Sequence, residues 1–340
     1  MALAEAGRVP DAIVRFAIRR IVALRARGEA RTARSAREFA RAMRAQPVLT
    51  HAAEANRQHY EVPAELFERV LGPRLKYSCA WFADDHGDLA RAEEEMLALT
   101  CERAGLEDGM RVLDLGCGWG SLSTFVAERF PRARVLAVSN SRTQRAFLLD
   151  RCAKRGLANV EVRTADAALL ELPAAGFDRV VSVEMFEHVR DWHALYARIA
   201  RWLAPDGRFF QHVFCHRAHP YRFEDEGGTD WMARNFFSGG IMPSFDLPEA
   251  VGGALAVEAR WRVSGTHYAR TAEAWLARAD AQRDALRRVL AAAGGADVDA
   301  ARALQRWRMF FMACAELFAF RDGEEWLVGH YLLRPTERRA

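Results

Sequence analysis

The chain has 340 residues, of which 51% are hydrophobic and 28% are charged, and its net charge is +4. This length allows one large core with a helical appendage, and the charge is too small to indicate a nucleic-acid-binding protein. No apolar run is long enough to cross a bilayer, and charged residues precede the first apolar stretch. We therefore expect a cytoplasmic protein without a signal peptide. Frequent arginine and alanine suggest a bacterial source.

The six cysteines are widely spaced, with no CxxC pair and no nearby histidine cluster. This pattern indicates neither a disulfide framework nor a zinc site. We expect reduced thiols and no bound metal.

Residues 11–45 predict a basic amphipathic helix. Its apolar stripe holds Ile13, Ala17, Ile21 and Leu24 and is widened by Val14 and Ile18. The first 50 residues hold eleven arginines against four acidic residues. Such a helix could make a peripheral membrane contact on anionic lipid. It could instead pack on the protein body or on a second copy in a homodimer. We favour packing, because no tryptophan is present to anchor the helix at a membrane.

Short apolar segments then alternate with helical ones, after further helices within 55–105. The pattern predicts strands at 111–115, 134–139, 159–164, 178–183 and 207–214, and helices at 121–130, 141–155 and 191–203. Alternation of this kind indicates an α/β fold with a parallel sheet and helices on both faces.

We divide the chain into an N-terminal helical region, 1–105, and a main domain, 106–340. The main domain carries insertions at about 216–250 and 270–320. The second insertion is predicted to be mostly helical, with a break at Gly294-Gly295. Strands are predicted at 256–266 and 325–334.

The strongest motif is a glycine loop between the first strand of this series and its helix. Gly116, Gly118 and Gly120 allow a tight turn and the close approach of a ligand. The spacing differs from the GxGxxG of dinucleotide-binding proteins, and Asp114 precedes the loop. A carboxylate there would repel a pyrophosphate but would suit the ammonium group of S-adenosylmethionine (SAM), which has no phosphate.

The next two strands also end in polar residues. Asn140 and Gln144 could bind the ribose hydroxyls, although a helix cap would explain the Ser/Asn pair equally well. Asp166 could accept a hydrogen bond from the adenine amine, or it could be a solvated turn residue.

Glu184, Glu187 and His188 follow the fourth strand of the series. Ligands of parallel α/β sheets bind at this edge, and a helical turn would place the three side chains on one face. They could accept the proton that an alkylamine must lose before methylation.

The segments Tyr77–Phe82, Leu113–Gly120 and Met185–His188 resemble the cyclopropane fatty acid synthase superfamily, and most closely its coclaurine N-methyltransferase branch. This resemblance implies a Rossmann-like class I SAM methyltransferase with a mostly parallel seven-stranded sheet. It also implies N-terminal helices and a helical insertion over the active site. By the same resemblance Tyr77 and Ser78 would close over SAM, Gly116 and Gly118 would underlie its methionine part, and Asn140 and Gln144 would hold its ribose.

In the lipid-modifying members of this superfamily, a Cys, a Glu, a His and a Tyr surround a bicarbonate that serves as base. The matching residues here are Cys79, Glu187, His212 and Tyr268. This chain departs from the lipid enzymes at Glu184. They have glycine at that position, whereas the amine methyltransferases have glutamate, as here. A second carboxylate is costly in a site meant for an acyl chain, which favours an amine substrate.

We therefore predict a SAM-dependent N-methyltransferase acting on a small, tetrahydroisoquinoline-like or aryl-alkyl amine. The alternative is a cyclopropane-fatty-acyl-phospholipid synthase or lipid C-methyltransferase acting on unsaturated acyl chains. A SAM-binding partner subunit without catalysis is a third hypothesis, which the Glu-Glu-His cluster disfavours.

Overall fold

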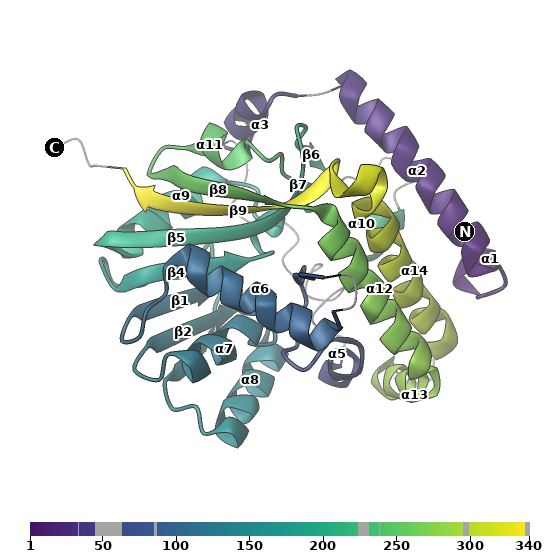
Figure 1. Ribbon diagram of the computed structural model, residues 1–340, viewed down its shortest axis with the longest axis horizontal. Coiled ribbons are helices and arrows are strands. Elements are labelled where there is room, and N and C mark those ends of the chain that lie inside the picture. The colour runs from purple at the N-terminus through teal and green to yellow at the C-terminus, as the bar shows by residue number, and fades with distance from the viewer. Residues whose placement is uncertain are drawn as a thin grey trace.

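The computed structural model describes residues 1–32, 34–44, 63–84, 87–223, 231–237, 239–294 and 299–336. A seven-stranded sheet forms one end of the molecule, and a group of helices stands at the other (Figure 1). The strand order is β3-β2-β1-β4-β5-β9-β8. The strands are β1 (Arg111–Leu115), β2 (Arg134–Ser139), β3 (Val160–Thr164), β4 (Phe177–Val183), β5 (Leu203–His216), β8 (Leu255–Val263) and β9 (Trp326–Pro335).

Strands β1 to β5 run parallel, whereas β9 pairs antiparallel with both β5 and β8. The predicted mostly parallel, seven-stranded sheet is therefore confirmed. Its register places His212 of β5 directly opposite His330 of β9, and Trp261 of β8 opposite His330 on the other side.

Helices cover both faces of the sheet because successive strand residues point to opposite sides. In β1, Val112 packs with α6 (Leu89–Ala104) and α7 (Ser121–Arg129). The next residue, Leu113, packs on the opposite side with α9 (Trp192–Trp202) and α3 (Ala36–Met43). Helix α8 (Arg142–Arg155) covers β2 and β3 through Leu148 and Cys152.

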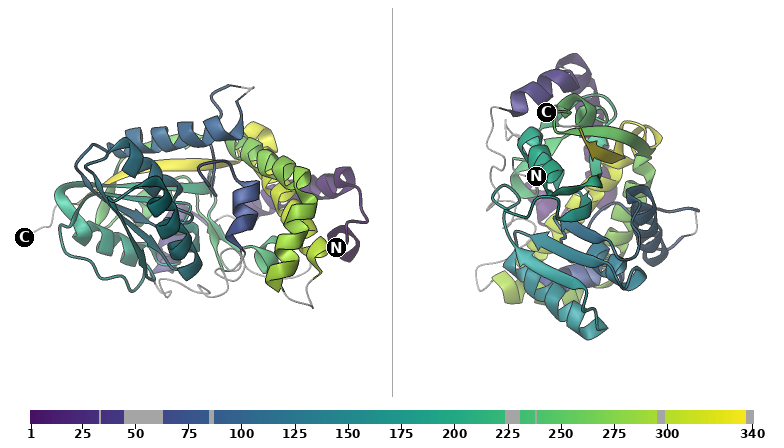
Figure 2. Two further views of the ribbon diagram at one scale, coloured as in Figure 1. Left: turned by 90° about the horizontal axis from the view of Figure 1, so that it is seen from below. Right: turned by 90° about the vertical axis from the view of Figure 1, so that its left-hand side faces the viewer.

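The helical end of the molecule is a second apolar core. Helix α14 packs against α12, α13 and α2, and Trp307 and Phe311 are buried among them (Figures 1 and 2). The elements are α1 (Ala2–Glu5), α2 (Asp11–Thr32), α5 (Ala64–Val70), α12 (Gly265–Ala281), α13 (Arg283–Gly294), α14 (Ala300–Phe318) and the short helix η2 (Phe320–Gly323). In its described part, the segment between β5 and β8 holds short elements, namely β6 (Tyr221–Arg222), α10 (Trp231–Asn235), β7 (Ile241–Met242) and α11 (Leu247–Val251).

The single helix predicted at 11–45 is wrong in its extent, because the helix is broken. Helix α2 ends at Thr32, and α3 begins after Ser35, which caps it. The Ser35 hydroxyl accepts from the Glu38 backbone N–H, and Glu38 Oε2 accepts from the Ser35 N–H at 2.9 Å. This reciprocal capping box starts a new helix, which crosses to the α9 side of the sheet.

Helix α2 packs on the protein body with only part of the predicted stripe, namely Val14 and Ile18. Val14, Val22 and Ala26 are buried against the helical core, and Arg15 binds Glu273 through two hydrogen bonds. Ile13, Phe16, Ile21 and Leu24 are instead between 39% and 64% exposed. The favoured packing interpretation thus describes one side of the helix, whereas the outer side carries these apolar residues together with the exposed Arg20 and Arg27.

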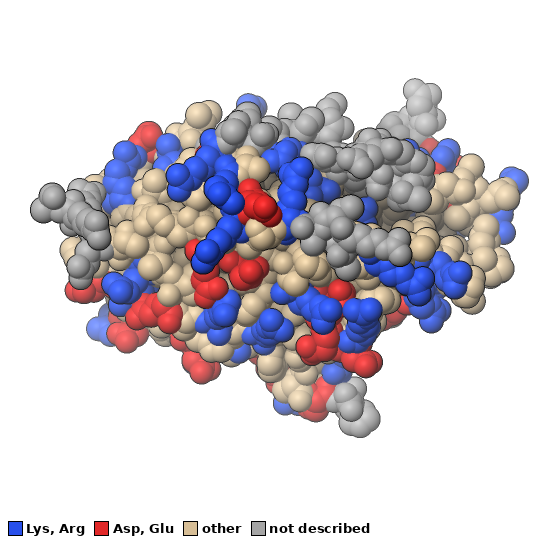
Figure 3. Space-filling model, turned by 90° about the horizontal axis from the view of Figure 1, so that it is seen from above, with Lys and Arg blue, Asp and Glu red and all other residues tan. Residues whose placement is uncertain are grey.

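Many arginines of the described surface are paired with acids. Figure 3 shows basic and acidic side chains interspersed over much of one face. Examples are the pairs Arg74–Glu128, Arg208–Glu258 and Arg111–Asp178. Every described helix falls short of the length or the hydropathy that a membrane span requires.

Candidate active site

A narrow cavity lies at the carboxyl ends of β1 and β4, beside the glycine loop. Asp114, Gly116 and Gly118 line it from the β1 side, and Glu184 lines it from the end of β4. Gly116 has φ +89°, and a Cβ there would lie 2.6 Å from the Cγ of Met185. The loop therefore requires glycine at this position, both for its backbone conformation and for the close approach of Met185.

Several buried polar atoms point to a ligand in this cavity. The lining atoms Thr100 Oγ1, Trp119 Nε1, Ser121 Oγ and Gln144 Nε2 are buried and have no hydrogen-bond partner in the described chain. Unsatisfied buried groups are costly and rare in folded proteins. The cavity is thus built for a polar molecule that supplies both donors and acceptors.

Asp114 is the carboxylate of this cavity. Its Oδ2 accepts a hydrogen bond from Ser123 Oγ at 2.5 Å, and the residue is buried. Burial raises the pKa of Asp114 to about 6, although the Ser123 hydrogen bonds oppose the rise. A bound ammonium group would stabilise the ionised form, so the residues present fit the amino-acid end of SAM.

The other residues predicted to bind the cofactor are placed less uniformly. Gln144 lines the cavity and is fixed by a 2.6 Å hydrogen bond from Ser139 Oγ to its Oε1. Asn140 is exposed, and Asp166 accepts from the Ala168 backbone N–H at 2.7 Å; neither is among the lining residues. Their predicted ribose and adenine contacts stay predictions.

Tyr77 and Ser78 come from a segment that was expected to be helical. Residues 72–82 form no helix, and this corrects the prediction. The segment is held by Glu93 of α6, a buried carboxylate that accepts from the backbone N–H groups of Gly72, Arg74 and Lys76. This anchoring brings Tyr77 and Ser78 to the cavity, as the resemblance implied.

The carboxylate of Glu184 is the centre of the candidate catalytic site. Its Oε1 lies 2.9 Å from the backbone N of Cys79 and 3.2 Å from His212 Nε2. Its Oε2 accepts from the Tyr268 hydroxyl at 2.5 Å. Burial raises the pKa of Glu184, while the charge of Lys76 and the hydrogen bonds from Cys79 and Tyr268 oppose the rise.

Cys79 takes part through its backbone rather than its thiol. The sulfur donates to the Ala80 carbonyl at 3.2 Å, and burial holds the pKa of the thiol well above its ordinary value. A thiol in this environment is not a nucleophile. The six cysteines are all buried and none is in a disulfide.

The expectation that Glu184, Glu187 and His188 share one face of a helical turn is wrong. Glu184 precedes the short 3-10 helix η1 (Phe186–His188) and has φ +47°, the left-handed region that a non-glycine residue rarely adopts. Its backbone N–H is held by the His212 carbonyl at 2.8 Å, which supports this conformation. The kink turns the Glu184 side chain toward Tyr268 and His212.

Glu187 and His188 contact different residues from those that contact Glu184. Glu187 is buried; its Oε1 accepts from the Phe214 N–H at 2.8 Å, and its Oε2 has no partner among the described residues. Burial, together with the nearby charge of Glu184, raises its pKa well above the ordinary value. His188 packs against the ring of Phe237, with centroids 4.8 Å apart.

Four aromatic residues could hold a cationic amine by its charge, namely Trp231, Phe236, Phe237 and Trp326, but they lie mostly in the core. Trp231 donates to Glu5, Trp326 donates to the Tyr221 hydroxyl, and Phe236 stacks on Phe310. Phe237 is the exception, because it lies beside His188. Residue 238 and residues 224–230 fall outside the described residues. The string His59-Tyr60-Glu61-Val62, which also resembles this superfamily, falls outside them too.

Sequence analysis missed three charged or titratable residues around Glu184. Lys76 is buried and donates to Ser78 Oγ and to the Cys79 carbonyl at 2.7 Å. His330 and Arg103 continue the contacts of His212 away from the cavity. Lys76 could have been singled out, because it is one of two lysines and precedes the Tyr-Ser-Cys motif.

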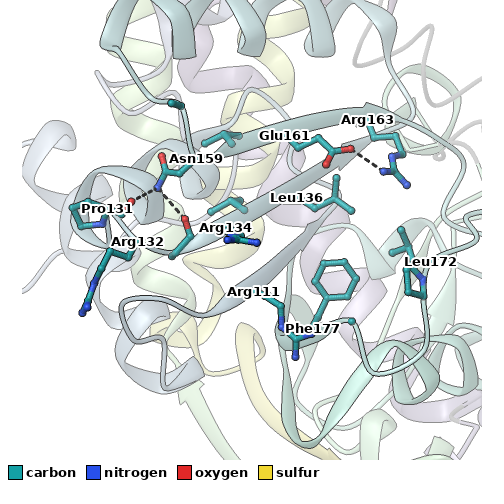
Figure 4. Close-up of a pocket in the computed structure, with 16 residues that line it drawn as sticks. Arg111, Pro131, Arg132, Arg134, Leu136, Asn159, Glu161, Arg163, Leu172 and Phe177 are labelled. Carbon is teal, nitrogen blue, oxygen red and sulfur yellow. Dashed lines mark hydrogen bonds and ion pairs between the residues drawn. The ribbon is translucent and has the colours of Figure 1, made fainter.

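A second hollow lies at the opposite edge of the sheet, where β1, β2 and β3 begin (Figure 4). Arginines line it, but Arg111 is paired with Asp178 and Arg163 with Glu161. Asn159 donates to main-chain carbonyls at its rim (Figure 4). None of the residues predicted to bind SAM or to act in catalysis lines this hollow.

Comparison with known proteins identifies the family. Residues 48–326 match the family described as mycolic acid cyclopropane synthetase. The chain is 36% identical over 295 residues to (S)-coclaurine N-methyltransferase of Thalictrum flavum subsp. glaucum, covering 86% of this chain and 81% of that protein. It is 31% identical over 274 residues to cyclopropane-fatty-acyl-phospholipid synthase of Escherichia coli K12, covering 80% of this chain and 66% of that protein.

Solved structures agree with these relationships. The structure of coclaurine N-methyltransferase bound to N-methylheliamine and S-adenosylhomocysteine matches with a TM-score of 0.93 and 33% identity, covering 98% of both chains. The mycolic acid cyclopropane synthase CmaA1 matches with a TM-score of 0.70 and 23% identity, covering 85% of this chain and 99% of that one, and thus shares the fold. The coclaurine N-methyltransferase of Thalictrum flavum is a plant protein, so this relative gives no support to the expected bacterial source. The fold, the cavity and the relatives together show that this chain is a SAM-dependent methyltransferase and belongs to the mycolic acid cyclopropane synthetase family, with the coclaurine N-methyltransferases among its relatives.

Proposed function

We propose that this enzyme methylates the nitrogen of a small amine, of the tetrahydroisoquinoline or aryl-alkyl type, and that Glu184 accepts the amine proton. The main support for this proposal is the position of the Glu184 carboxylate, which lines the SAM cavity and accepts hydrogen bonds from Tyr268 and Cys79. Relatives described as (S)-coclaurine, pavine and (S)-tetrahydroprotoberberine N-methyltransferases support the choice of an amine.

SAM supplies a methyl group from its sulfonium, and the remainder of the cofactor leaves as S-adenosylhomocysteine. The protein must present a nitrogen lone pair in line with that methyl group. An alkylammonium has no lone pair, so a nearby base must take its proton first. Burial raises the pKa of Glu184 and so brings it closer to the pKa of an alkylammonium. The charge of Lys76 and the hydrogen bonds from Cys79 and Tyr268 favour the ionised carboxylate.

The same donors argue against the lipid alternative. The resemblance places a bicarbonate among the residues matching Cys79, Glu187, His212 and Tyr268. Here three of those four residues, Cys79, His212 and Tyr268, direct a hydrogen-bonding group at the carboxylate of Glu184. We propose that this side chain takes the place of the free anion. Cyclopropane formation would then lack its separate base.

The proposal is tested with SAM carrying a fully deuterated methyl group. The purified enzyme is incubated with a panel of cyclic and aryl-alkyl amines and with vesicles of monounsaturated phospholipid, and products are read by mass spectrometry. An amine product that keeps all methyl deuterons, formed by the wild type and reduced at least about 100-fold in Glu184→Gln, supports N-methylation. A lipid product that has lost one deuteron would instead establish ring closure. No product from either substrate class would also contradict the proposal.

We also propose that the outer side of α2 is a contact surface for a second copy of the chain. Ile13, Phe16, Ile21 and Leu24 follow one another at helical spacing on a side that the body does not cover. Sedimentation equilibrium should show a dimer that Phe16→Glu weakens. Binding of the wild type to anionic vesicles without self-association would favour the membrane contact instead.

A further inference from the structure

A line of hydrogen-bonded side chains leads away from Glu184 across the sheet. His212 Nε2 lies 3.2 Å from Glu184 Oε1, and His212 Nδ1 lies 2.9 Å from His330 Nε2. His330 Nδ1 lies 2.7 Å from an Nη of Arg103. The two histidines are opposed on β5 and β9, and Arg103 comes from the last turn of α6, which contacts β5.

The direction of every hydrogen bond in this line follows from its last member. A guanidinium has N–H donors and no acceptor, so His330 Nδ1 must accept from Arg103. The ring proton of His330 is then on Nε2, which donates to His212 Nδ1. The ring proton of His212 is consequently also on Nε2, where it donates to Glu184. One arginine thus fixes two tautomers and the direction of three hydrogen bonds.

The surroundings keep both rings neutral, as this arrangement requires. His212 and His330 are fully buried. Burial lowers the pKa of His212 well below its ordinary value, and the charges of Lys76 and Arg103 add to this effect. Burial also lowers the pKa of His330, with further contributions from His212 and Arg103. Arg103 itself is held over the ring of Trp261, with its Cζ 5.0 Å from the ring centroid.

We infer that Arg103 and His330 are positioning residues, which hold His212 in the tautomer that donates to Glu184. The line does not carry the substrate proton outward, because arginine cannot accept one. Its effect is to keep Glu184 a hydrogen-bond acceptor at Oε1 and therefore available as a base. This last step rests on the proposed function of Glu184, whereas the tautomers do not depend on any substrate.

The first test is spectroscopic and needs no methyl acceptor. Enzyme containing 15N-labelled histidine is examined by NMR, and the signals of His212 and His330 are assigned by their loss in single variants. We expect both rings to be neutral and protonated on Nε2 near pH 7. Arg103→Met should let the tautomers of His330, and then of His212, redistribute. Arg103→Lys should preserve them, because lysine is also only a donor.

Variants at His330 separate positioning from simple packing. His330→Gln can accept from Arg103 with its carbonyl oxygen and donate to His212 with its amide group, so it should retain the His212 tautomer. His330→Leu fills the space but removes the donor. Arg91→Met is the matched control, since Arg91 lies on the same helix and pairs only with acidic residues near its surface.

Kinetics then connect the tautomer to catalysis. With the amine found by the deuterium experiment, His330→Leu and Arg103→Met should lower kcat/KM roughly 10- to 100-fold, as with other histidines that lose an orienting partner. The acid limb of the pH profile should move to higher pH, because Glu184 loses an N–H donor. The other titratable groups facing Glu184 stay in place; they are Lys76, Cys79, Glu187, Tyr268 and Cys314.

The outcomes are distinct. Nε2-protonated rings in the wild type, lost in His330→Leu and kept in His330→Gln, support the inference even if no amine is methylated. Protonation of His212 on Nδ1 would overturn it, as would an unchanged His212 signal in both Arg103→Met and His330→Leu. An unchanged pH profile in a folded His330→Leu enzyme that methylates amines would overturn the catalytic part.

Discussion

Replacing Tyr268 by phenylalanine removes the hydroxyl that lies 2.5 Å from Glu184 Oε2 and leaves the ring, which stacks on Phe318 with centroids 4.3 Å apart. A hydrogen bond to a charged group stabilises it by about 1.5–3 kcal/mol. One pKa unit corresponds to about 1.4 kcal/mol. The loss should therefore raise the pKa of Glu184 by roughly 1–2 units, from a value that burial has already raised.

The sign follows from which form the hydroxyl favours. Tyr268 donates to the ionised carboxylate, so its removal makes protonation easier and the base is lost at a higher pH. The acid limb of kcat/KM should move upward by roughly 1–2 pH units, with a smaller change on the alkaline side. The assay is the rate of deuterated-methyl transfer to an amine between pH 5 and 9.

Tyr331→Phe is the matched control. Tyr331 is also fully buried, but its hydroxyl donates to the Phe245 carbonyl at 2.7 Å and not to Glu184. This variant should lose about 0.5–1.5 kcal/mol of stability, as expected for a neutral hydrogen bond, but keep the wild-type pH profile. The reasoning about Glu184 would be refuted if Tyr268→Phe left the acid limb in place, or if both variants shifted it equally.

Three further outcomes can be measured directly. Because burial raises the pKa of Asp114 to about 6, calorimetric affinity for S-adenosylhomocysteine should fall up to about tenfold per pH unit below pH 6, and Asp114→Asn should abolish this dependence. Gly120→Ala combines a φ of +79° with a Cβ only 2.1 Å from Leu148, so urea unfolding should show a loss of about 2–5 kcal/mol. Gly109→Ala, at φ +90° with no atom within 4 Å, should lose only about 1–2 kcal/mol. Glu5→Ala leaves the buried Trp231 indole without its acceptor and removes the ion pairs of Glu5 with Arg302 and Arg306, so hydrogen exchange in α1 should become faster while exchange in β1 is unchanged.

The sheet could be predicted because local patterns determine it. Alternating apolar segments located β1 to β5 to within a few residues, apart from the longer β5. The break between α2 and α3 also had a local signal, since Ser35 and Glu38 form the S-x-x-E pattern of a capping box. The non-helical course of residues 72–82 could have been suspected from Gly72-Pro73, which favours a turn.

The site could be predicted only as far as its motifs reach. His212 and Tyr268 were named by the resemblance and Glu184 by its place after the fourth strand, and the structure brings the three together. The partners of His212 could not be found in this way. Arg103 and His330 are 227 positions apart and carry no motif, and their contact depends on the docking of α6 over the β9 register. Tertiary geometry of this kind has no signature in a single sequence.

The position of β9 has a consequence for how the protein matures. Among the described strands β8 pairs with β9 alone, and β9 pairs with β5 on its other side. During synthesis β8 therefore stays unpaired until β9, the last strand of the sheet, has been made. His330 lies on that same strand. The methyltransferase is thus completed in a single late event, so that a chain interrupted before β9 would expose two strand edges to aggregation and could not yet orient its base.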